Sequence, residues 1–229
     1  RQVYSLLSPT DPADALTTYY ALYHDAHRTQ LTLHRTEEGE VDGFLAECMT
    51  GFDLFRPLIV MRAHSEAILH WLLDQSLRPG RAYYFVVPLS FASALEQYLD
   101  IWQPITARIY RLYTPYFVPV INVLVVQNAR ADHLPRFEIR AGGKVMAVAG
   151  VNWRSPHFAE VYVYTEPEAR GRGWGKSVLS ACTAALLKEG LTPLYMVEED
   201  NITSIHLAES LGYRDTGARQ FICFGILPG

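Results

Sequence analysis

The stretch Glu160-Val-Tyr-Val-Tyr-Thr-Glu-Pro-Glu-Ala-Arg-Gly-Arg-Gly-Trp-Gly175 joins a β-forming segment to a glycine-rich turn. Its first six residues are mostly β-branched or aromatic, which predicts a strand over 160–165. Pro167 cannot donate to a strand ladder, and it therefore ends that strand. The three glycines that follow permit positive φ and a close approach of the backbone to a bulky group. The pattern predicts a strand that runs into an open turn.

A helix-forming segment, 176–189, comes directly after the turn. Apolar residues recur behind the turn at helical spacing, and Gly190 is a suitable C-cap. The unpaired N–H groups and the dipole of a helix N-terminus attract an anion. Three cationic residues surround this turn, namely Arg170, Arg172 and Lys176. The sequence therefore predicts a phosphate-binding turn.

The turn has neither the spacing of a Walker loop nor that of a Gly-x-Gly-x-x-Gly dinucleotide turn. It reads Arg-x-x-Gly-x-Gly over 170–175, and in this it resembles motif A of the GNAT superfamily of acyl-CoA-dependent N-acyltransferases. Downstream, 194–197 is a short apolar strand, and Asn201 opens a second helix that closes at Leu211-Gly-Tyr213. This order resembles motif B of the same family. Two motifs at this separation make the resemblance specific.

The resemblance implies that acyl-CoA is the co-substrate, with acetyl-CoA as the commonest donor. Its pyrophosphate would lie on the turn, and its pantetheine arm would lie between the strands 160–165 and 194–197. The residues implied at the coenzyme are Val163, Tyr164, Thr165, Arg170, Gly171, Arg172, Gly173, Trp174, Gly175, Lys176, Ser177 and Asn201. Four of them have an alternative role. Arg170 can brace the turn, Arg172 and Lys176 can be plain surface charges, and Asn201 can simply cap its helix.

Glu160 and Tyr213 are the candidate catalytic residues. Glu160 lies ten residues before Arg170, where members of the family often carry a base that removes the amine proton through water. A solvated strand glutamate is an equally weighted alternative. Many members also place a tyrosine seven residues after the motif B asparagine, but this chain has Ala208 there. Tyr213, Tyr164 or a water can substitute as the acid, the thiolate can leave unassisted, and Tyr213 can instead only pack the helix end.

The first half of the chain shows the same order of elements as the second. After a helix from the Ser8–Asp11 cap to Ala26, we expect a hairpin (30–35, 41–49), strand 58–62, helix 65–77, strand 82–87, helix 90–99 and strand 105–112. The second half repeats this order from a hairpin (137–140, 144–153) to a last strand, 219–226, at an offset of about 110 residues. The predicted fold class is α/β (α+β), with two GNAT-like halves, each a mixed twisted sheet flanked by helices.

The expected domains are 1–127 and 128–229. Between its strand and helix the first half has only Arg62-Ala-His64 and no glycine. Such a turn cannot present several amides to a pyrophosphate, so we expect that the first half is degenerate and has lost coenzyme binding. An unrelated α/β module with a similar alternation is the alternative for this half.

Composition excludes several classes of function. The chain has 229 residues, a formal net charge of −4 and 49% hydrophobic residues, and no basic run exceeds two residues, so we expect no nucleic-acid partner. The longest apolar run, 116–126, is too short to cross a bilayer, and we expect no membrane partner. The three cysteines and the histidines at 24, 27 and 34 lack metal-ligand spacing, so no metal is predicted. An odd number of cysteines favours reduced thiols in a cytoplasmic protein.

The resemblance to the GNAT superfamily implies an N-acetyltransferase. It would move an acetyl group from acetyl-CoA to a primary amine of a small molecule or peptide, by direct attack in a ternary complex, as a monomer or homodimer. The tandem arrangement also resembles the glycine N-acyltransferase branch, which favours a small-molecule acceptor. A non-catalytic acyl-CoA sensor or regulator stays open because of Ala208, and so does an interaction domain that binds no coenzyme.

Overall fold

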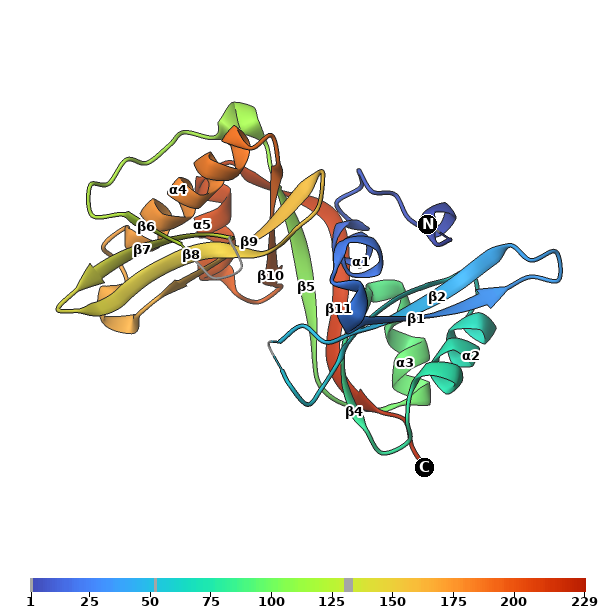
Figure 1. The fold of residues 1–229 in the computed structure, drawn as a ribbon. Helices are drawn as coiled ribbons and strands as arrows, with labels where there is room; N and C mark the ends of the chain where they lie inside the picture. Colours follow the sequence, from blue (N-terminus) through green and yellow to red (C-terminus); the bar gives the residue numbers. More distant parts are fainter. Residues whose placement is uncertain (1, 52, 130–133) are drawn as a thin grey trace. The chain divides into compact units, whose positions relative to one another are not determined.

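The structure, a computed structural model, describes residues 2–51, 53–129 and 134–229. The chain divides into two compact units, which are described separately below (Figure 1). Unit 1 comprises Arg1–Ala107 and Ala218–Gly229, and unit 2 comprises Arg108–Gly217. Two long strands, β5 (Asp100–Leu112) and β11 (Tyr213–Ile226), each contribute residues to both units.

Unit 1 contains a mixed sheet. Its strands follow the order β1 (Thr29–Arg35), β2 (Val41–Cys48), β3 (Leu58–Ala63), β4 (Ala82–Pro88) and the last part of β11. The pair β3–β4 is parallel, and the pairs β1–β2, β2–β3 and β4–β11 are antiparallel. The helices of this unit are α1 (Ala15–Thr18), α2 (Glu66–Ser76) and α3 (Ala92–Tyr98).

Helix α2 begins directly after β3. The hydroxyl of Ser65 accepts a hydrogen bond from the backbone N–H of Ile68, and this N-cap starts the helix without a glycine-rich turn. The side chains of Leu69, Leu72 and Leu73 are fully buried in the core of unit 1. The connection between β3 and α2 is therefore short, as the sequence predicts.

Unit 2 also contains a mixed sheet. Its strands follow the order β6 (Val126–Ala129), β7 (Pro135–Ala141), β8 (Lys144–Arg154), β9 (Phe158–Thr165), β10 (Thr192–Glu198) and the end of β5. The strands β6 to β9 are antiparallel neighbours, whereas β9 and β10 are parallel. Helix α4 (Trp174–Lys188) contacts β7 to β10 and lies along this sheet, and α5 (Ile202–Ser210) contacts β10 (Figure 1).

The core of unit 2 forms between α4 and the sheet. Val178, Cys182 and Leu186 recur every four residues on α4, and all three are fully buried. Alternate residues of β9, Ala159 and Val161, face the same core. This packing fixes the beginning of α4, and therefore the glycine-rich turn, against the end of β9.

The predicted fold class is confirmed, and most predicted elements lie within a few residues of the observed ones. The first helix is an exception, because α1 covers only Ala15–Thr18 and continues as a π-helical turn, Tyr19–Tyr23. Upstream, the carboxylate of Asp11 accepts the N–H of Ala13, and that of Asp14 accepts the N–H of Ser8. These bonds stabilise turns in place of the first helical turns.

The observed units differ from the expected division after residue 127. The last twelve residues belong to unit 1, where Gln220–Ile226 pair with β4 and Phe221 and Cys223 are buried in the core. The end of β5 belongs to unit 2, whose core contains Tyr110 and Leu112. Each half of these two strands therefore belongs to the unit in which its apolar side chains are buried.

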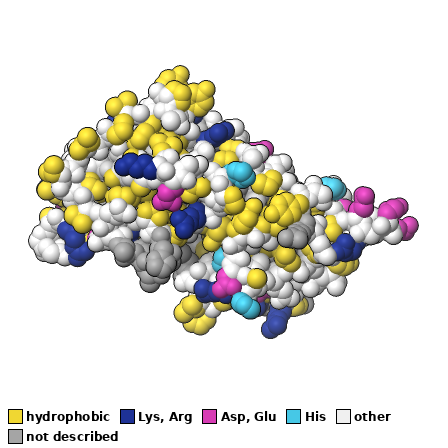
Figure 2. Space-filling model, turned by 45° about the horizontal axis from the view of Figure 1, so that its top comes forward, with side chains coloured by type: hydrophobic (Ala, Val, Ile, Leu, Met, Phe, Trp, Pro, Cys, Tyr) yellow, Lys and Arg dark blue, Asp and Glu magenta, His cyan; other side chains and the backbone are white. Residues whose placement is uncertain are grey.

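In the described part of the chain, no helix is long and apolar enough to cross a membrane. The apolar segment that follows the 3-10 turn Thr114–Tyr116 is irregular, and its residues Ile121 and Val123 are more than 90% exposed. Lys and Arg side chains are scattered over the face that Figure 2 shows, without a continuous basic stripe.

Candidate active site

The glycine-rich turn is open toward solvent. Gly171 and Gly173 have φ values of +77° and +73°, a region that strongly favours glycine. A Cβ atom built at either position would meet no heavy atom within 4 Å. Both glycines are therefore required by the backbone conformation, and the space beside them is free for a ligand.

The backbone donors of the turn lie at the start of a long helix. Gly173 is the N-cap of α4, and the first N–H with a backbone acceptor at this end is that of Ser177, which donates to the carbonyl of Gly173 at 3.0 Å. Among the described residues, the N–H groups of 171–176 have no backbone acceptor. With the dipole of a 15-residue helix behind them, these donors form an anion site.

The cationic residues divide into two roles. Arg172 is exposed, with its guanidinium 5.1 Å from the centre of the Trp174 ring, and Lys176 is half-buried on the first turn of α4. In contrast, the Nε of Arg170 donates to the carbonyl of Thr165 at 3.3 Å. Arg170 therefore braces the turn against the end of β9, which was the alternative role for this residue.

Two other predicted contacts have structural roles in the turn. Ser177 is buried, and its hydroxyl donates to the carbonyl of Gly173 at 3.1 Å and accepts from the side-chain amide of Asn122 at 3.1 Å. A Cβ atom at Gly175 would approach the hydroxyl of Thr165 to 2.7 Å, so glycine lets α4 pack closely on β9. Asn122 carries no signal in the sequence, because it lies in an irregular segment far from the motif.

Strands β9 and β10 pair along only part of their length. The parallel register joins Phe158–Glu160 to Thr192–Leu194 and stops there. The rest of β9, which includes Val163, Tyr164 and Thr165, pairs with β8 on its other side but not with β10. The two strands therefore part after Glu160, and the edge of β9 that faces β10 is available to an extended ligand.

Glu160 lies at the point where the strands part, and it is buried rather than solvated. The side-chain amide of Asn152 donates to one carboxylate oxygen at 2.9 Å, and the indole N–H of Trp153 donates to the other. A β-bulge between Val151 and Trp153 brings both donors beside Glu160. Burial raises the pKa of the Glu160 carboxyl, although the two hydrogen bonds oppose that shift.

Tyr213, the second candidate catalytic residue, lies inside the core of unit 2. Its side chain is fully buried in the core of unit 2, and its hydroxyl lies 2.7 Å from the hydroxyl of Thr183 on α4. Burial raises the pKa of Tyr213 far above its ordinary value. These contacts favour the alternative role of Tyr213, in which it packs the end of the helix. Ala208 is also fully buried.

Asn201 and Tyr164 remain accessible. The side-chain oxygen of Asn201 accepts the N–H of Ser204 at 3.1 Å, so this residue caps α5 and is exposed. Tyr164 is 51% exposed, and its hydroxyl lies 3.4 Å from a carboxylate oxygen of Glu166. Neither residue is held inside the core, in contrast to Tyr213.

One family of known proteins matches this chain over the site just described. The model described as the Acetyltransferase (GNAT) family matches residues 96–213, slightly more than half of the chain. This chain belongs to the GNAT acetyltransferase family. The match covers the turn, both parting strands and the capped helix α5. Membership supports acyl-CoA-dependent acetyl transfer as the general activity. Among curated proteins, no sequence match was found.

Solved structures show the same fold over nearly the whole chain. A GCN5-related N-acetyltransferase from Kribbella flavida is 15% identical, with 94% of this chain and 96% of that chain covered and a TM-score of 0.64. A Drosophila protein is 13% identical, with 100% and 91% covered and a TM-score of 0.68. A tandem GNAT protein from the clavulanic acid biosynthesis pathway is 13% identical, with 95% and 88% covered and a TM-score of 0.59. The tandem GNAT architecture predicted from the repeated order of elements is confirmed.

No group of three or more potential metal ligands is found among the described residues of this GNAT chain. Two of the three histidines considered above have other partners: the Nδ1 atom of His24 lies 2.7 Å from the hydroxyl of Thr29, and that of His34 lies 2.6 Å from the carboxylate of Asp42. Both residues lie in unit 1.

Proposed function

We propose that unit 2 binds acetyl-CoA and transfers its acetyl group to a primary amine of a small molecule or peptide. One observation carries this proposal: β9 and β10 part at a buried glutamate, beyond which β9 leads directly into an open turn of free N–H groups. The turn would hold the pyrophosphate, with Arg172 and Lys176 beside it. The free edge of β9 at Val163–Thr165 would bind the pantetheine amides.

The reaction is a direct attack in a ternary complex. The amine nitrogen forms a bond to the acetyl carbonyl carbon, the C–S bond breaks, and the amine proton leaves through water to Glu160. A backbone N–H of β9 directed at the carbonyl oxygen would stabilise the oxyanion by roughly 3 kcal/mol. Alignment of the amine and the thioester supplies much of the remaining acceleration, because a neutral amine is already a good nucleophile.

The burial of Glu160 supports its role as the base. A general base works best when its pKa lies near the working pH, and burial shifts the pKa of this carboxyl in that direction. Asn152 and Trp153 orient the carboxylate. A fully solvated glutamate would have neither property.

The leaving group needs little help. A thiol has a pKa of about 8.5, so a thiolate can leave without prior protonation near neutral pH. This fits a chain in which Ala208 stands at the position of the usual tyrosine and Tyr213 is buried. The same observation favours a second candidate function, a non-catalytic acyl-CoA-binding sensor or regulator.

We further propose a cytoplasmic monomer or homodimer without a nucleic-acid or membrane partner. Cys48, Cys182 and Cys223 are free and buried, and burial raises the pKa of each thiol to about 12. Such thiols are poorly reactive and suit a reducing compartment.

Two measurements on the same protein test these functions. Calorimetry measures the affinity for acetyl-CoA, and a thiol assay measures coenzyme A release with a panel of primary amines, amino acids and short peptides, with an amine-free reaction as the control. The proposed transferase binds acetyl-CoA and releases thiol with at least one amine. Binding without release from any amine would favour the sensor, and absence of binding would exclude both functions.

A further inference from the structure

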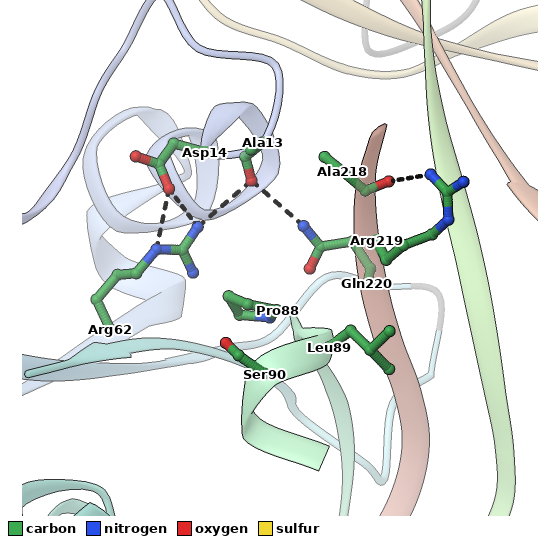
Figure 3. Close-up of a pocket in the computed structure, with 9 residues that line it drawn as sticks. All are labelled: Ala13, Asp14, Arg62, Pro88, Leu89, Ser90, Ala218, Arg219 and Gln220. Carbon is green, nitrogen blue, oxygen red and sulfur yellow. Dashed lines mark hydrogen bonds and ion pairs between the residues drawn. The ribbon is translucent and has the colours of Figure 1, made fainter. Parts of the chain in front are cut away.

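Unit 1 contains a cavity of about 350 Å³ that the proposed reaction does not use. It lies beside the carboxyl ends of β3 and β4, under the segment that leads into α1 (Figure 3). The residues that line it are Ala13, Asp14, Arg62, Pro88, Leu89, Ser90, Ala218, Arg219 and Gln220. All of them belong to unit 1, so this cavity is separate from the turn and the parting strands of unit 2.

One polar atom inside the cavity lacks a partner. Gln220 is only 2% exposed, and its side-chain nitrogen donates to the carbonyl of Ala13 at 3.3 Å. Because that carbonyl can only accept, the orientation of the amide is fixed and its oxygen faces away from Ala13. This oxygen is buried, and no group in the described part of the chain donates a hydrogen bond to it. Figure 3 shows it directed toward the space beside Pro88.

Two of the charged residues that line the cavity, Arg62 and Asp14, are paired with each other. The Nε of Arg62 donates to a carboxylate oxygen of Asp14 at 3.0 Å, and a second nitrogen of the same guanidinium contacts that oxygen as well. Arg62 also donates to the carbonyls of Met61 and Ala13. This ion pair is balanced, so a charged ligand group buried beside Arg62 and Asp14 would have no opposite charge to compensate it.

The rest of the lining limits the ligand in size and kind. Pro88 and Leu89 provide apolar surface, and Ser90 is exposed at the opening. The guanidinium of Arg219 donates to the carbonyl of Ala218 at 2.9 Å and is partly exposed. A cavity of this volume is at the small end of the range for ligand sites. It fits a molecule with one donor group and a short apolar part.

We propose that this cavity binds a small uncharged molecule that presents an N–H or O–H group, such as a carboxamide, to the side-chain oxygen of Gln220. The orphan atom is an acceptor, so the ligand must supply the hydrogen. A buried acceptor without a hydrogen bond destabilises the folded protein. A hydrogen bond from the ligand removes this cost, and together with the apolar contacts to Pro88 and Leu89 it drives binding. The inference does not depend on the function proposed for unit 2.

Two isomeric probes test this proposal. N-methylpropionamide has an N–H group, whereas its isomer N,N-dimethylacetamide has none. Each is titrated into the full-length ¹⁵N-labelled protein without acetyl-CoA, and the side-chain amide resonance of Gln220 is followed by NMR. We expect saturable movement of this resonance with the first probe, and a Kd roughly tenfold higher for the second.

Variants separate the hydrogen bond from the shape of the cavity. Gln220→Met should raise the Kd for N-methylpropionamide roughly tenfold, whereas Gln75→Met, at an exposed position on α2, should not change it. Gln220→Met also loses the hydrogen bond to the carbonyl of Ala13. A second variant, Leu89→Trp, keeps that hydrogen bond and narrows the opening of the cavity. Equal affinity for the two isomers, or binding that leaves the Gln220 resonance in place, would show that no hydrogen bond to the side-chain oxygen of Gln220 selects the ligand and would overturn the proposal.

Discussion

Glu160 is the residue on which the proposed chemistry depends. It is the last residue of β9 that pairs with β10, and its two carboxylate oxygens are occupied by one donor each. Its buried position gives it a raised pKa and places it beside the gap that would receive the thioester. A glutamine at this position would keep the size of the side chain but could not accept a proton from the amine.

We expect that Glu160→Gln lowers kcat/KM about 10²-fold or more near neutral pH and leaves the affinity for acetyl-CoA nearly unchanged. The wild-type rate should rise with pH as the carboxyl, whose pKa is raised, loses its proton. The Glu160→Gln variant should lack this rise. The difference in rate between the two proteins should shrink at high pH, because the amine is already neutral there. Rates measured by thiol release across pH 5–9 test this, and calorimetry tests the affinity.

A loss of rate in Glu160→Gln can be assigned to the missing base only if the variant is folded. The introduced glutamine would have one oxygen for the two donors of Asn152 and Trp153, so a small loss of stability is expected, and thermal unfolding checks it. Superimposable pH–rate curves for the two proteins would rule out Glu160 as the base.

Tyr213 leads to the opposite expectation. Tyr213→Phe removes the hydrogen bond to Thr183 and leaves the Thr183 hydroxyl buried without its partner, so the free energy of unfolding should fall by about 1–2 kcal/mol. The acetyl-transfer rate should stay within about twofold, because the proposal gives Tyr213 no role in proton transfer. Urea unfolding and the thiol assay measure the two effects.

A double variant gives the control for Tyr213. Tyr213→Phe combined with Thr183→Val removes both partners, and should be less destabilised than the sum of the two single variants. A rate loss of about 100-fold in Tyr213→Phe, with the fold intact, would restore the role as an acid.

At the scale of elements, the turn and the start of α4 act together. The positive φ values of Gly171 and Gly173 orient the chain so that the N–H groups of 171–176 have no backbone acceptor. Ser177 and Arg170 hold this conformation through hydrogen bonds to the carbonyls of Gly173 and Thr165. The turn therefore already has the open conformation that the proposed pyrophosphate site requires.

We expect that Gly173→Glu raises the Kd for acetyl-CoA by roughly two orders of magnitude, because it places a carboxylate beside the expected pyrophosphate, and like charges cost several kcal/mol. Gly143→Glu is the matched control. Gly143 has a φ of +79°, and a Cβ atom added there would meet no heavy atom within 4 Å, but this glycine lies in the β7–β8 turn. Calorimetry measures the Kd for acetyl-CoA in both variants. The comparison separates the effect of backbone strain from the effect of losing the site. Unchanged affinity in Gly173→Glu would refute the role of the turn.

At the scale of the whole molecule, the division of the chain into units decides which fragments can fold. The core of unit 2 includes Tyr110 and Leu112 from β5, whereas Phe221 and Cys223 from β11 are buried in unit 1. A fragment cut after residue 127 would therefore lose part of one core and carry part of the other.

We expect that fragment 108–217 unfolds cooperatively in urea, whereas fragment 128–229 does not. The first keeps the core residues of unit 2 on one chain, and the second lacks β5 and exposes the apolar end of β11. Urea unfolding followed by tryptophan fluorescence, with the full-length chain as the reference, measures this. Cooperative unfolding of 128–229 alone would support the division after residue 127.

Local sequence was sufficient to predict most individual elements of this protein. The glycine-rich turn, the cap of α5 at Asn201 and the glycine-free start of α2 depend on neighbouring residues, so their patterns could be read directly. Which side chains are buried and which strands pair follows instead from tertiary packing. Asn152 and Trp153 enclose Glu160 through a bulge, Thr183 holds Tyr213 in the core, and β5 and β11 divide between two units. These outcomes depend on partners that are distant in the sequence or on a bulge that changes the alternation of a strand, and local periodicity contains no information about either.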